Sequence, residues 1–156
     1  MGWSDGGITG MILAANEGRE HVDKLIIWGS NAYLTYEDYH NIVKVRDVSK
    51  TWSKSFRERF EPIYGEKGLQ KLWLGLVAHY VSLKDVCTKD LPNIQAETLI
   101  LHGDKDPLIA LEHPDYLLKH IPNAELYRFP NGRHDIHMNS KCSKEFNQIV
   151  DKFLSK

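Results

Sequence analysis

The residues Gly2-Trp3-Ser4-Asp5-Gly6 fit the pattern Gly-x-Ser-x-Gly, and they stand directly before a stretch whose apolar residues have helical spacing, residues 6–17. This pattern is typical of a tight turn between a strand and a helix, with the serine side chain projecting from the end of a sheet. Glycines two positions to either side of the serine suit a strained backbone, because a Cβ there would collide with the neighbouring chain. A simple glycine-rich turn has the same composition. Together with the following helix, the stretch predicts a strand–turn–helix unit with Ser4 at its turn.

Three further stretches read as strands of one sheet. Residues 24–29 and 97–103 are short apolar runs that end in glycine, as in buried strands of a parallel sheet. Residues 124–130 alternate between apolar and polar side chains and end in proline. Helical patterns lie over 113–121 and near the C-terminus, where Phe146 begins an amphipathic run. This alternation of helices and strands predicts an α/β layered fold with a parallel sheet.

The stretch between the first two of these strands has a different character. Residues 36–90 contain two series of apolar residues with helical spacing. One runs from Trp52 to Ile63 and the other from Leu69 to Tyr80. Many of them are aromatic, which is typical of a buried helical core. We therefore expect a helical insert over 36–90.

The composition excludes several classes of protein. Among 156 residues, 20 are Lys or Arg and 21 are Asp or Glu, which gives a net charge of −1. That balance argues against a nucleic-acid binder, which needs a basic surface, and against a polybasic membrane anchor. No apolar run approaches the roughly 18 residues of a membrane span. Two cysteines are too few for a disulfide scaffold, so a reducing, intracellular setting is expected.

Candidate acidic and basic groups follow the second and third of these strands. One buried strand leads into the stretch His102-Gly103-Asp104-Lys105-Asp106-Pro107. In α/β enzymes, catalytic carboxylates commonly lie just after the carboxyl end of a strand. A turn before Pro107 would also explain both aspartates. The loop after the third strand carries His134 and, three residues later, His137. That spacing could suit a metal pair, but no Glu or Cys stands at ligand spacing, so no metal is expected.

The order of these candidates along the chain is informative. A serine, then an aspartate, then a histidine, each after a strand, is the order of the catalytic groups in α/β-hydrolases and differs from the other two common serine-triad orders. The helical insert lies where such enzymes carry a cap. The sequence therefore predicts part of an α/β-hydrolase fold with a helical cap insert.

Particular motifs make the resemblance more specific. The runs GWSDGG, KLIIWGSNAY, RDVSKTWS, LILHGDKDPL and NGRHDIH resemble the biphenyl-hydrolase-like family, the valacyclovir hydrolase family of α/β-hydrolases. The similarity runs from Met1 to the C-terminal helix. It implies a serine esterase that cleaves esters of α-amino acids, with a small-molecule ester as substrate and no cofactor. The oligomeric state stays open, with a monomer as one candidate for the complete protein.

The resemblance also implies a role for each candidate. Ser4 would be the nucleophile, His134 the general base and acid, and Asp106, not Asp104, the group that orients His134. The backbone N–H of Asp5 would stabilise the oxyanion, and its carboxylate would bind the α-ammonium of the substrate. A carboxylate at this position could instead simply cap the helix that follows.

Members of such families carry several strands before the Gly-x-Ser-x-Gly turn, so residues 1–156 are expected to be a partial domain, the C-terminal portion of a truncated α/β-hydrolase. The strand that leads into Ser4 is expected to be missing, which would leave the strand at 24–29 as a bare edge. Two other functions stay open: a hydrolase of carbon–carbon bonds on the same scaffold, and a non-catalytic fragment. The compartment is expected to be mitochondrial, by resemblance, or cytoplasmic, since any leader would precede Met1.

Overall fold

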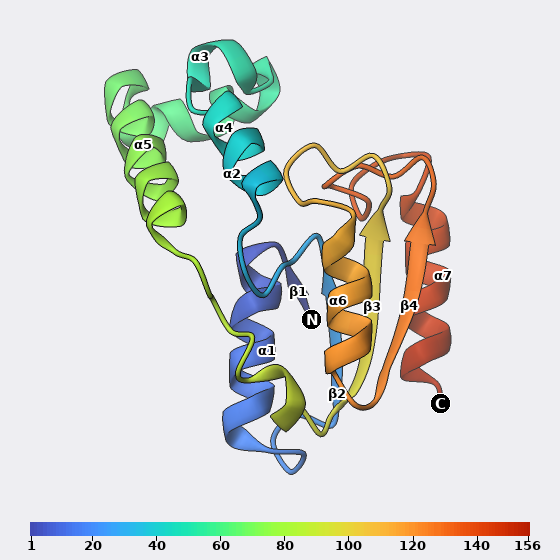
Figure 1. The fold of residues 1–156 in the computed structure, drawn as a ribbon. Helices are drawn as coiled ribbons and strands as arrows, with labels where there is room; N and C mark the ends of the chain where they lie inside the picture. The colour runs from blue at the N-terminus through green and yellow to red at the C-terminus, as the bar shows by residue number, and fades with distance from the viewer. The chain divides into compact units, whose positions relative to one another are not determined.

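Four parallel strands form one sheet in a computed structural model that describes residues 1–156 (Figure 1). Their order across the sheet follows the chain: β1 (Gly2–Trp3), β2 (Lys24–Trp28), β3 (Glu97–Gly103) and β4 (Ala124–Phe129). The strand before Ser4, expected to be missing, is present as the two residues of β1. They pair with Ile27 and Trp28, so the carboxyl end of β2 is not a bare edge.

Helices cover both faces of this sheet. α1 (Asp5–Glu17) and α6 (Glu112–His120) lie on one face, and α7 (Ser143–Leu154) lies on the other (Figure 1). Successive strand residues point to opposite faces. Ile100 therefore belongs to the core under α1 and α6, whereas its neighbours Leu99 and Leu101 belong to the core under α7. A short 3₁₀ helix, η1 (Leu91–Asn93), closes the first core. The class expected from the sequence, α/β with a parallel sheet, is confirmed.

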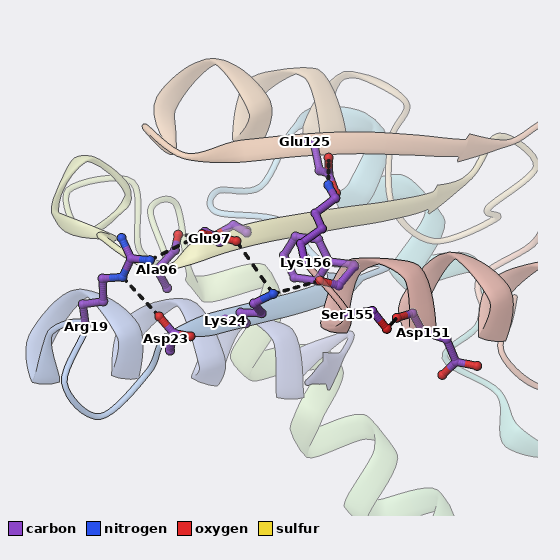
Figure 2. A network of polar contacts seen from close by, with 11 residues as sticks. Arg19, Asp23, Lys24, Ala96, Glu97, Glu125, Asp151, Ser155 and Lys156 are labelled. Carbon is purple, nitrogen blue, oxygen red and sulfur yellow. Dashed lines mark hydrogen bonds and ion pairs between the residues drawn. The ribbon is translucent and has the colours of Figure 1, made fainter.

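Charged contacts gather where the strands begin (Figure 2). The ammonium of Lys24, at the start of β2, donates to the carbonyl of Phe153 at 2.9 Å and lies 5.3 Å from the centre of its ring. Lys156 lies over the same ring and pairs with Glu125 of β4 at 2.7 Å. Exposed ion pairs contribute at most about 1 kcal/mol each. These contacts join the C-terminal end of α7 to the first residues of β2 and β4. They lie at the end of the sheet opposite to the carboxyl ends of the strands.

The chain divides into two units. The first comprises Met1–Tyr33 and Asp85–Lys156, and the second is Leu34–Lys84. Residues 85–90, which the sequence analysis placed in the insert, thus lie in the first unit. None of the helices in either unit has the length and apolar character needed to cross a membrane.

The second unit is entirely helical. It contains α2 (Tyr36–Lys44), α3 (Val48–Thr51), α4 (Lys54–Tyr64) and α5 (Glu66–Ser82). Aromatic contacts hold it together, since the Trp52 ring meets Phe56 at 4.9 Å and Trp73 at 5.1 Å between ring centres. The Trp73 indole N–H donates to the carbonyl of Val45 at 2.7 Å. The aromatic residues therefore pack against one another, but none of them is buried and Phe56 is 37% exposed. The expectation that they form a buried core is wrong, because the buried apolar residues of this unit are Val48, Leu69 and Val77.

Candidate active site

Ser4 stands on a strained turn between β1 and α1. Its φ is 54°, and it is the one residue other than glycine with a positive φ. Its N–H donates to the carbonyl of Trp28 at 2.9 Å, and its own carbonyl accepts from the N–H of Gly7 at 2.9 Å. Although Ser4 is the N-cap of α1, its side chain makes no capping hydrogen bond. A strained residue persists only where surrounding bonds hold it. The turn therefore holds the Ser4 backbone without using its hydroxyl.

The glycines around this turn differ in their importance. A Cβ on Gly2 would collide with the backbone of Gly6, so this position needs a glycine. A Cβ on Gly6 would meet nothing within 4 Å, so the expectation that both flanking glycines are required sterically is wrong for Gly6. Gly7 is instead the second position that requires a glycine, because a Cβ there would collide with the hydroxyl of Ser30. That hydroxyl in turn donates to the carbonyl of Ser4 at 2.9 Å.

Asp106 and His134 are in direct contact. Oδ2 of Asp106 lies 2.8 Å from Nδ1 of His134, and the aspartate side chain is fully buried. Oδ1 accepts from the N–H groups of Leu108 at 2.8 Å and Ile109 at 3.1 Å. A carboxylate with these partners accepts hydrogen bonds only. In the neutral imidazole, the hydrogen is therefore assigned to Nδ1 and the lone pair to Nε2.

Asp104 has a different partner. Its carboxylate pairs with Arg128 at 2.9 Å, and the same guanidinium reaches Asp115 of α6 at 2.7 Å. Of the two aspartates in the loop after β3, the structure brings only Asp106 to His134.

The imidazole of His134 rests against residues from the other strand ends. Gly29, directly after β2, has a φ of 58°, and a Cβ on it would lie 3.0 Å from Cε1 and Nδ1 of His134. The indole N–H of Trp3, on β1, donates to the carbonyl of His134 at 2.8 Å. Ser4 follows Trp3 and is bonded to Trp28, the residue before Gly29. Sequence reasoning missed Trp3 and Gly29, since a variable position of a motif and a strand-end glycine give no signal of this contact.

His137 is engaged by another tryptophan. The indole N–H of Trp28 donates to Nδ1 of His137 at 3.0 Å. Burial lowers the pKa of His137 below its ordinary value of 6.5. Across the chain, no group of three or more His, Cys, Asp and Glu side chains is arranged to hold a metal ion. The spacing of His134 and His137 therefore serves two separate contacts.

A parallel sheet with helices on both faces, a serine on a strained strand-to-helix turn and an Asp–His pair at the same edge define the α/β-hydrolase class. No family model matches the chain. The chain is a homologue of serine hydrolase BPHL: it is 41% identical to the Mus musculus protein and 38% identical to the Homo sapiens protein, each over 159 residues. Those alignments cover 99% of this chain and 53% of each relative, so the chain spans about half the length of the curated relatives it matches.

Solved structures agree on the fold. The enol-lactonase from Burkholderia xenovorans LB400 superposes with a TM-score of 0.69 over 99% of this chain and 64% of that one, at 19% identity. At that identity the likeness concerns the fold alone. The expected resemblance to biphenyl-hydrolase-like proteins and the expected part of an α/β-hydrolase fold are both confirmed.

Proposed function

We propose that this chain carries the catalytic groups of a serine hydrolase that cleaves carboxylic esters through an acyl-enzyme. The contact between Asp106 and His134 is the observation that supports this most directly, because it leaves Nε2 of the imidazole as a base. The strained backbone of Ser4 is the second support. The homology to serine hydrolase BPHL is consistent with both, over the half of that protein that the chain matches.

The reaction has two steps. Nε2 of His134 takes the proton of the Ser4 hydroxyl as its oxygen attacks the ester carbonyl, and the imidazolium then protonates the departing alcohol. Water repeats the sequence on the acyl-enzyme and releases the acid. Buried Asp106 stabilises the imidazolium and keeps the proton on Nδ1. The oxyanion would accept from the N–H of Asp5, the first residue of α1, where backbone N–H groups point out of the helix.

For the substrate, we propose esters of α-amino acids. Asp5 follows Ser4 directly and is exposed, and we assign its carboxylate to the acyl part of the substrate. A carboxylate there attracts an α-ammonium and repels anionic substrates. Carbon–carbon bond hydrolases of aromatic ring-cleavage products act on anions, so the position of Asp5 favours the amino-acid ester.

A fluorophosphonate probe tests the nucleophile. We expect stoichiometric labelling of Ser4, with Ser4→Ala unlabelled. In Asp106→Asn, the amide oxygen keeps the bonds from Leu108 and Ile109, so its NH₂ group faces Nδ1 of His134 and imposes the wrong tautomer. Labelling should then fall by about 10⁴-fold, the scale for that reversal in a serine triad. Folded wild-type chain that stays unlabelled would favour a non-catalytic role.

The substrate is tested by comparing an amino-acid ester with its N-acetylated form. We expect hydrolysis of the free amine to be faster by tenfold or more, and the preference to disappear in Asp5→Asn. Equal rates for the two esters in the wild-type chain would contradict the proposed role of Asp5 and leave the nucleophile unaffected.

A further inference from the structure

Two tryptophans on adjacent strand ends direct their indole N–H groups at one loop. Trp3 and Trp28 are register partners in the pairing of β1 with β2. Trp3 donates to the backbone carbonyl of His134, and Trp28 donates to Nδ1 of His137. The rings of Trp3 and His137 also pack at 4.7 Å between centres. The loop after β4 is thus bonded to both strand ends by two donors that accept no hydrogen bond themselves.

These contacts fix the two histidines in opposite tautomers. Nδ1 of His134 faces a carboxylate and carries a proton, whereas Nδ1 of His137 faces an N–H and carries a lone pair. The carbonyl that Trp3 holds belongs to His134 itself, so its bond sets the position of the residue from which the imidazole extends. The ring of Trp3 also packs against this imidazole at 5.3 Å between centres, and Gly29 and Asp106 contact it from other directions.

We propose that Trp3 is a positioning residue for the reaction: its indole N–H ties the strand that carries Ser4 to the residue that supplies the base, with Trp28 and His137 as a second tie. This inference rests on the proposed function for its effect on rate. The bond spans 131 residues of sequence and joins the immediate neighbour of the nucleophile to the backbone carbonyl of the residue that carries the base. A shift of about 1 Å between such groups reduces rates by about 100-fold, so this tie acts on catalysis and not only on stability.

The chain offers a matched control for the test. Trp3→Phe keeps an aromatic ring and removes the N–H donor. Trp73→Phe removes an equivalent indole-to-carbonyl bond, 2.7 Å to Val45, in the second unit. Trp28→Phe, which removes the donor to His137, is the second variant and decides the question where Trp3→Phe does not fold.

Three measurements are made on the wild-type chain and each variant: the free energy of unfolding, the ¹⁵N and ¹H imidazole signals of His134, and the pH profile of Ser4 labelling by a fluorophosphonate. In Trp3→Phe we expect altered His134 signals, labelling slower by tenfold or more, and a displaced pH midpoint. In Trp73→Phe we expect unchanged His134 signals, whatever its loss of stability. Trp28→Phe should resemble Trp3→Phe.

Unchanged His134 signals and an unchanged labelling profile in folded Trp3→Phe would overturn the inference, as would equal changes in Trp3→Phe and Trp73→Phe. Absence of labelling in the wild-type chain would count against the proposed function instead. The imidazole signals would still show whether Trp3 positions His134, so the two failures are distinguishable.

Discussion

Replacing Gly29 by alanine adds one methyl group directly against the imidazole of His134. The new Cβ would lie 3.0 Å from Cε1 and Nδ1, whereas carbon atoms in contact are ordinarily about 3.5 Å or more apart. The ring must therefore retreat by about 0.5 Å, away from its present position 2.8 Å from Asp106. The φ of 58° adds a separate backbone cost of about 1–2 kcal/mol for any residue with a Cβ.

Gly18→Ala is the control for the backbone cost. Gly18 has a φ of 75°, and a Cβ there would meet no atom within 4 Å. Its ψ of 177° places Gly18 in a region that essentially only glycine adopts, so we expect Gly18→Ala to lower the free energy of unfolding by about 1–3 kcal/mol. In Gly29→Ala we expect about 1 kcal/mol from overpacking of the ring in addition to the backbone cost. The assay is urea unfolding followed by tryptophan fluorescence.

The same shift should slow the reaction. Since about 1 Å of misplacement reduces rates by about 100-fold, a shift of about 0.5 Å reduces fluorophosphonate labelling of Ser4 by about tenfold. Gly18→Ala should label at the wild-type rate. If Gly29→Ala unfolds at the same urea concentration as Gly18→Ala and labels like the wild type, the imidazole does not rest on Gly29 and the reasoning is refuted.

Three further results are expected. Gly2→Ala should destabilise the turn strongly, because its Cβ meets the backbone of Gly6, whereas Gly6→Ala should be tolerated; thermal unfolding of both variants compares them, and similar losses would contradict this. Burial raises the pKa of the Cys87 thiol to about 12, so in Cys142→Ser the remaining thiol should react with iodoacetamide at pH 8 far more slowly folded than in urea; equal rates would show that Cys87 is accessible. Burial lowers the pKa of His102 below 6.5, so on acidification the unfolded chain binds this proton before the folded chain does, and stability falls as the pH drops below about 6.5. In His102→Leu, the free energy of unfolding should therefore fall less between pH 7.5 and 5.5 than in the wild type. An identical fall in both proteins would exclude this contribution.

Most of the sheet could be predicted from the sequence. The apolar runs that became β2 and β3 are buried on both faces, so they leave a clear pattern in the chain. The pattern of β1 is different, because Gly2 and Trp3 are too few to show periodicity. Their pairing with Ile27 and Trp28 is a tertiary fact. The expectation of a missing strand was wrong for these two residues, whereas Lys24, Leu25 and Ile26 of β2 have no partner on that side, as a bare edge requires.

The site could be predicted in its parts but not in its connections. Spacing after strands pointed to the loop that holds Asp104 and Asp106, and the family resemblance chose Asp106. The structure adds a physical reason, since Arg128 binds Asp104 from the next strand. The bond from Trp3 to His134 joins residues 131 positions apart, and no local pattern encodes such a contact. Long-range hydrogen bonds of this kind depend on the register of the sheet, which the sequence alone does not specify.

The two indole donors have a consequence for how acid acts on this loop. Trp3 donates to a backbone carbonyl, which does not titrate, so this tie does not depend on pH. A proton added at Nδ1 of His137 would set two N–H groups against each other and release the indole of Trp28. Acidification therefore weakens the tie from Trp28 and leaves the tie from Trp3 in place, so the two tryptophans anchor the same loop with different sensitivity to acid.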